Sequence, residues 1–176
     1  GSNLTFRENK VDVFIPGVGV NYAFTNAVSV FGGVHKGFSP PGSSDGEEAE
    51  ESINYELGSR FAFGQLRGEI VGFYNDYSNL LGSDLAATGG TGSLDQFNAG
   101  EVAVSGLEIL LNYELLPNHK SFKLPVTFAY TFTNTEFLNS FGSNDDLWGE
   151  VTEGDELPYI PTHQFNVGLS LEHTKY

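Results

Sequence analysis

The chain has 176 residues, with 8 Lys and Arg residues against 23 Asp and Glu residues, and its net charge is −15. So acidic a chain repels nucleic acid phosphates, which argues against a DNA- or RNA-binding function. The absence of Cys excludes disulfides, thiolate metal sites and cysteine nucleophiles. No apolar run approaches the roughly 18 residues of a membrane-spanning helix.

Apolar side chains alternate with small or polar ones along most of the chain, as in strands whose two faces meet different surroundings. In the first such segment, Val18, Val20 and Tyr22 fall on one face, and small or polar residues fall between them. No stretch has helical periodicity. In chain order the pattern predicts seven strands, at 12–24, 27–38, 52–63, 67–78, 101–114, 123–137 and 162–173.

The lengths of these strands and of their links favour a membrane. Several strands exceed ten residues, whereas strands of soluble proteins usually run to about 5–6 and a tilted membrane-crossing strand needs about 9–11. The links alternate strictly between short and long, as in outer-membrane barrels with short periplasmic turns and long extracellular loops. The short links are 25–26, 64–66 and 115–122, and the long links are 39–51, 79–100 and 138–161.

Aromatic residues cluster near the ends of the predicted strands. Outer-membrane barrels carry aromatic girdles at both membrane interfaces, so these positions predict girdles. The residues concerned are Tyr22 and Phe24, Phe61 and Phe63, and Phe73, Tyr74 and Tyr77.

The predicted fold class is all-β: an antiparallel up-and-down transmembrane β-barrel segment. Bacterial barrels have an even number of strands from 8 upward, so seven strands are expected to be part of a larger barrel. Two alternatives stay open. One is a soluble or surface β-sandwich for adhesion or glycan binding. The other is a small closed outer-membrane barrel that recruits an eighth strand from residues 3–10.

The sequence predicts no catalytic residue, no metal site and no cofactor. The histidines are not spaced as zinc-binding pairs, and no nucleophile elbow or phosphate-binding loop occurs. The chain is therefore not expected to be an enzyme. The histidines are His35, His119, His163 and His173.

Six strings, in order along nearly the whole chain, resemble the barrel domain of TonB-dependent outer-membrane receptors, and most closely the ferric-citrate-receptor-like branch. They lie at Phe14–Tyr22, Gly33–Pro41, Glu51–Gly58, Phe73–Leu80, Val104–Glu108 and Gly154–Phe165.

The resemblance implies a segment of about 7 of the roughly 22 strands of such a receptor, with residues 1–176 forming part of the barrel domain and the plug domain absent. It implies uptake of a ferric complex, either a siderophore or ferric citrate, in the outer membrane of a Gram-negative bacterium. The implied partners are outer-membrane lipid, the receptor's own plug domain and the energy-coupling protein TonB.

Candidate site residues fall into two sets. Loops on a rigid scaffold carry recognition, so the ligand-binding candidates are Lys36, Phe97, Asn98, Trp148 and His163. The candidates that face the barrel lumen, toward substrate or plug, are Glu56, Arg60, Glu108 and Gln164. Anionic ferric citrate calls for Arg or Lys near the outer mouth, and this segment offers only Arg7, Lys10 and Lys36. Either other parts of the receptor supply the cations or the substrate is not anionic.

Overall fold

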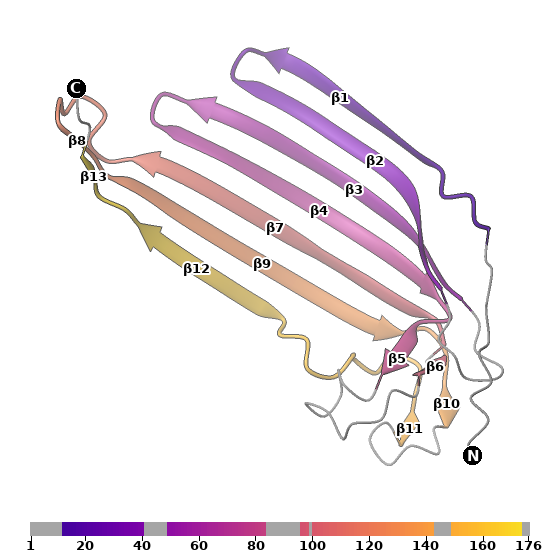
Figure 1. The fold of residues 1–176 in the computed structure, drawn as a ribbon. Helices are drawn as coiled ribbons and strands as arrows, with labels where there is room; N and C mark the ends of the chain where they lie inside the picture. The colour runs from indigo at the N-terminus through magenta and orange to yellow at the C-terminus, as the bar shows by residue number, and fades with distance from the viewer. Residues whose placement is uncertain (1–11, 41–48, 84–95, 99, 143–148, 174–176) are drawn as a thin grey trace, which may run out of the picture.

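The computed structural model describes residues 12–40, 49–83, 96–98, 100–142 and 149–173. Seven long strands form one antiparallel sheet in the order β1-β2-β3-β4-β7-β9-β12 and lie side by side in a single layer (Figure 1). Within the described ranges, no helix is long and apolar enough to cross a membrane. The seven strands are β1 (Gly17–Thr25), β2 (Val28–Ser39), β3 (Glu50–Phe63), β4 (Leu66–Ser78), β7 (Val102–Glu114), β9 (Pro125–Phe137) and β12 (His163–Leu169).

All seven strands fall on segments where alternation predicted them. The two outermost strands differ most in length. β1 begins at Gly17 rather than at residue 12, and β12 ends at Leu169 rather than at residue 173. Beyond β12, the chain pairs again at β13 (Glu172–His173) with β8 (Phe122–Lys123). The predicted strand 123–137 is likewise divided between β8 and β9.

Two of the long links contain short paired strands that the sequence did not predict. β5 (Leu81–Ser83) pairs with β6 (Gln96–Asn98), and β10 (Phe141–Gly142) pairs with β11 (Glu150–Val151). Both pairs lie at one end of the sheet, and β8 and β13 lie at the other (Figure 1). We call these the loop end and the turn end.

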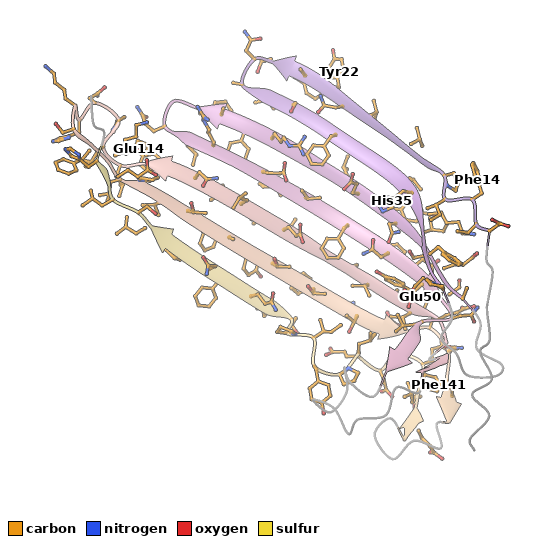
Figure 2. The ribbon with its side chains drawn as sticks, viewed as in Figure 1. Phe14, Tyr22, His35, Glu50, Glu114 and Phe141 are labelled. Atoms are coloured by element: carbon orange, nitrogen blue, oxygen red, sulfur yellow. The ribbon has the colours of Figure 1, made fainter. Side chains whose placement is uncertain are left out.

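Each connection at the turn end is held by a specific local feature. The Thr25 hydroxyl accepts hydrogen bonds from the backbone N–H groups of Ala27 and Val28, both at 3.1 Å. Gly64 has a φ of +59°, which glycine adopts without a steric penalty. The Glu114 carboxylate accepts the N–H groups of Leu116 and Leu124 at 2.9 and 2.8 Å, and Figure 2 shows Glu114 at this end.

The sheet has almost no core. Among the described residues, the buried apolar side chains are Val102, Ala103, Phe137 and Val151. The apolar side chains of the alternating pattern are exposed instead: Val18 is 76% exposed and Phe165 77%. No second sheet covers the seven described strands, so the sandwich alternative is wrong. β1 and β12 stand at opposite edges of the sheet, so these seven strands by themselves do not close into a small barrel. The eighth strand expected at residues 3–10 lies outside the described residues.

Candidate functional site

Pairing between the strands gathers the alternating side chains into two continuous faces. Residues directly opposite each other across an antiparallel pair point to the same side of the sheet. Thus Leu57 lies opposite Gly72, Gly72 opposite Leu107, and Leu107 opposite Phe132. The apolar face carries, on the seven strands in order, Val20, Val34, Leu57, Ile70, Leu107, Phe132 and Val167. The polar face carries Asn21, Gly33, Glu56, Glu69, Glu108, Thr131 and Gln164.

The apolar face ends at an inclined boundary near the loop end. The last apolar side chain toward the loop end is Ile53 on β3 and Phe165 on β12. Strand pairing places Phe165 level with Ser59 of β3, which is six residues from Ile53. Six residues span about 20 Å, and four strand steps span about 19 Å. The boundary therefore crosses the strands at roughly 45°, near the strand tilt of transmembrane barrels.

The height of the apolar face also matches a membrane. On β3 it runs from Ile53 to Phe63, about 33 Å along the strand at roughly 3.3 Å per residue. At a tilt of about 45° this becomes roughly 23 Å, close to the ~25 Å apolar band of outer-membrane barrels.

Most of the predicted girdle aromatics lie on the apolar face. Tyr22 and Phe24 contact edge to face with ring centroids 4.8 Å apart, and the Phe61 and Phe63 rings stack at 5.9 Å. Tyr74 lies 6.2 Å from Tyr55 on the neighbouring strand. Phe73 and Tyr77 are corrections, because their odd positions on β4 place them on the polar face.

The polar face holds charged groups around one aromatic ring. Arg60 forms an ion pair with Glu69, directly opposite on β4, and its guanidinium lies 4.0 Å from the centre of the Phe31 ring. Phe31, Arg60 and Glu69 line a depression of about 470 Å³, and Glu56 and Glu108 line it as well. The depression thus carries three carboxylates and one guanidinium, which leaves this part of the face acidic.

The loop end carries a small buried cluster on the polar face, formed by Val102, Phe137 and Val151. Val102 and Phe137 lie opposite each other on β7 and β9, whereas Val151 comes from β11 in the long link. Figure 2 shows Phe141 of β10 at this end, and its ring lies 5.6 Å from that of Phe137.

Hydrogen bonds fasten the same link to the end of β9. The Phe137 N–H donates to the Asp155 carbonyl, and the Gly154 N–H donates to the Phe137 carbonyl, each at 2.9 Å. The Leu157 N–H donates to the Thr135 hydroxyl at 2.9 Å. Part of the long link is therefore fixed against the polar face.

The family model "TonB dependent receptor-like, beta-barrel" matches residues 1–176. The chain belongs to the TonB-dependent receptor family. This family consists of receptors of the Gram-negative outer membrane, not of enzymes. The search of curated proteins gave no match.

Solved structures of iron-uptake proteins have a similar fold over part of their length. The ferric yersiniabactin uptake receptor FyuA from Yersinia pestis is 20% identical with a TM-score of 0.59, over 87% of this chain and 22% of FyuA. The FrpB iron transporter from Neisseria meningitidis is 17% identical with a TM-score of 0.52, over 70% of this chain and 20% of FrpB.

A mutant of the ferric enterobactin receptor PfeA from Pseudomonas aeruginosa is 18% identical with a TM-score of 0.51, over 88% of this chain and 32% of that protein. The chain thus spans between about a fifth and a third of each receptor. The likeness establishes the fold, a segment of a larger antiparallel barrel.

The structure places two of the ligand-binding candidates, Lys36 on β2 and His163 on β12, on strands that are not neighbours. Lys36 and His163 lie in strands rather than in loops, both on the apolar face. The Lys36 ammonium bonds Glu51 at 2.8 Å, and His163 Nδ1 lies 2.9 Å from the Tyr130 hydroxyl.

The remaining candidates belong to two of the long links, 79–100 and 138–161. Phe97 and Asn98 belong to β6, paired with Gly82 and Leu81. Trp148 lies outside the described residues. Ligand contact by Phe97, Asn98, Trp148 and His163 stays a prediction, whereas the place of Lys36 on the apolar face argues against ligand contact there.

The four lumen candidates, Glu56, Arg60, Glu108 and Gln164, share the polar face, and their contact with the lumen stays a prediction. Sequence reasoning missed Glu69 and Phe31 beside Arg60. The observed turn at residues 64–65 pairs Arg60 with Glu69, whereas the predicted link at 64–66 would have paired Arg60 with Ile70. The described residues hold no group of three or more His, Asp or Glu side chains placed to bind a metal.

Proposed function

We propose that this chain is part of the wall of an outer-membrane receptor that imports a ferric siderophore in a Gram-negative bacterium. The family match across residues 1–176 carries the proposal. The inclined apolar face supports it, because exposed apolar side chains at this height and slope suit hydrocarbon rather than water. The three similar proteins are each named for iron or a ferric siderophore.

The proposed membrane orientation places the polar face toward the lumen, the loop end outside the cell and the turn end in the periplasm. In this orientation Glu56, Arg60, Glu108 and Gln164 contact the plug domain. The three carboxylates in the depression that Arg60 lines support a plug surface that is basic at this height, since like charges would repel. TonB is the proposed energy-coupling partner of the complete receptor.

Ferric citrate, the more specific expectation from sequence, is the alternative substrate. Of the described Lys and Arg residues, Lys36 is the one at the loop end, and it already bonds Glu51. The described part of the chain therefore supplies no group of cations for a citrate anion. This favours a siderophore, or recognition by cations elsewhere in the receptor.

The test is growth of a strain that lacks its own ferric receptors and carries the complete gene. We expect growth on a ferric siderophore as sole iron source, no growth on ferric citrate, and loss of growth when TonB is deleted. Growth that is independent of TonB would overturn the transport proposal. Growth on ferric citrate alone would overturn the substrate assignment.

A second experiment uses the 176-residue chain by itself. Because its apolar face is uncovered, we expect the chain to require detergent or lipid and not to bind ferric complexes. Gel filtration without detergent gives the result. A monodisperse soluble protein would contradict the proposed membrane face.

A further inference from the structure

A groove of about 600 Å³ crosses the apolar face above Gly72. Leu57 and Leu107 flank the glycine on β3 and β7, and Phe132 closes the β9 side. Tyr55 and Tyr74 form the wall toward the loop end. The groove exists because position 72 has no side chain where both neighbouring strands carry leucine.

Glycine alone does not make a groove on this face. At Gly68 the ring of Phe61 and the side chain of Leu111 already occupy the space that a β-carbon would take. At Gly32 a β-carbon would lie 3.1 Å from the Glu56 carbonyl oxygen and 3.4 Å from Leu57. At Gly72 the nearest heavy atoms would be two backbone oxygens at 3.9 Å, so the space stays open.

The groove is complete within this chain. Its side chains come from β3, β4, β7 and β9, and each of these strands is paired on both sides. Strands added beyond β1 or β12 would therefore not cover it.

The surroundings define the occupant chemically. The groove opens into the apolar face, which is continuous with hydrocarbon in the proposed membrane orientation. An unfilled groove would deprive its lining of dispersion contacts, and a methylene chain restores them. Beyond the groove, toward the loop end, the apolar face carries the acids Glu51, Asp76 and Glu136 and one base, Lys36. An anionic headgroup therefore gains little there, and the contact is with the lipid's chain.

We propose that the groove above Gly72 binds one acyl chain of a lipid in the outer leaflet. This inference rests on the proposed membrane function, because only that orientation presents the face to lipid. Tyr55 and Tyr74 hold the end of the chain nearest its headgroup, and their hydroxyls suit the interfacial region where tyrosine is enriched in membrane proteins.

The experiment uses the complete receptor with the reporter substitution Phe132→Trp, in phosphatidylcholine vesicles whose acyl chains carry bromine. Quenching of this tryptophan, measured against the receptor without the reporter, reports chain contact in the groove. Gly72→Leu should fill the groove and reduce the quenching by about half, because the chain loses its contacts with the lining. Position 72 has room for the new side chain and does not have a positive φ.

Val18→Leu is the control, since Val18 is 76% exposed on the same face and lies outside the groove. Quenching that is equal with and without Gly72→Leu would overturn the groove proposal and leave the membrane function intact. No quenching in either protein would overturn the membrane orientation itself. A receptor dimer that cross-links through the groove and dissociates with Gly72→Leu would assign the groove to a second protein copy and also overturn the proposal.

Discussion

Gly106 of β7 lies so close to β9 that a β-carbon at position 106 would overlap the carbonyl oxygen of Phe132. The Phe73 ring covers the same glycine, with its Cε1 atom 2.9 Å from the position of such a carbon. A backbone oxygen in a paired strand cannot turn away without breaking the ladder. We therefore expect position 106 to tolerate no side chain larger than that of glycine.

Gly106→Ala should lower the free energy of unfolding of the complete receptor by about 1–3 kcal/mol, the usual cost of overpacking. The measurement is the temperature at which the purified receptor loses its folded mobility on a gel. Gly72→Ala is the matched control, because its added carbon meets nothing closer than 3.9 Å. Equal midpoints for the two variants would contradict the predicted overlap.

The stacking of Arg60 on Phe31 predicts an energetic coupling between these two side chains. A double-mutant cycle of Phe31→Leu and Arg60→Gln should give about 0.5–1 kcal/mol, the range of a partly exposed cation–π contact. Arg60 is 55% exposed on its side chain, so the lower part of the range is expected. Chemical unfolding of the four proteins supplies the numbers.

Glu69→Gln separates the ion pair from the ring contact in this experiment. If the coupling between Arg60 and Phe31 vanishes in the Glu69→Gln background, then Glu69 holds the guanidinium in place over the ring. A coupling near zero in the presence of Glu69 would show that the stacked arrangement contributes nothing.

We expect the buried ring of Phe137 to stabilise the long link at the loop end. Its side chain is 1% exposed, so Phe137→Ala should leave a cavity and cost about 3–5 kcal/mol of local stability. Faster amide hydrogen exchange across residues 149–157 is the expected readout. Phe165→Ala removes the same atoms from a side chain that is 77% exposed, and exchange in 149–157 should not change. Equal exchange in both variants would show that the cluster does not anchor the link.

Lys36→Ala should leave the affinity for a ferric siderophore unchanged. The ammonium bonds Glu51 and shares the apolar face with Val34, away from the lumen. Exposed ion pairs contribute about 0–1 kcal/mol, so stability should change little as well. Isothermal titration of the complete receptor measures the affinity. A ten-fold loss with Lys36→Ala, restored by Lys36→Arg, would return Lys36 to the ligand site.

Sequence periodicity predicted the strands and faces because one simple rule governs them. Every second residue from Ile53 to Phe63 meets the same environment, so the pattern persists across a whole strand. The rule also placed Glu56 and Gln164 on one face, although they lie on strands far apart in sequence. Phe73 and Tyr77 were assigned to a girdle from their aromatic character, whereas their parity on β4 places them on the opposite face.

Other features have no periodic signal. β10 and β11 are two residues each, too short for alternation to appear, and they form because Val151 packs on Phe137. Lys36 and His163 were assigned to loops because each lies near a predicted strand end, where propensity locates a boundary only to within a few residues. The groove above Gly72 depends on which side chains neighbouring strands bring together, and that requires the pairing.

In this single-layer sheet, an exposed side chain is not free to be replaced by any other residue. In most proteins an outward-pointing residue accepts almost any replacement, and constraint concentrates in the interior. Here Val20 and Leu57 are 71% and 66% exposed, yet an arginine at either position would have to enter the hydrocarbon of the proposed membrane. Related chains should therefore exchange one apolar residue for another on the outward face. A pattern of exclusively apolar substitution, which in most proteins marks the interior, would here mark the surface in contact with lipid.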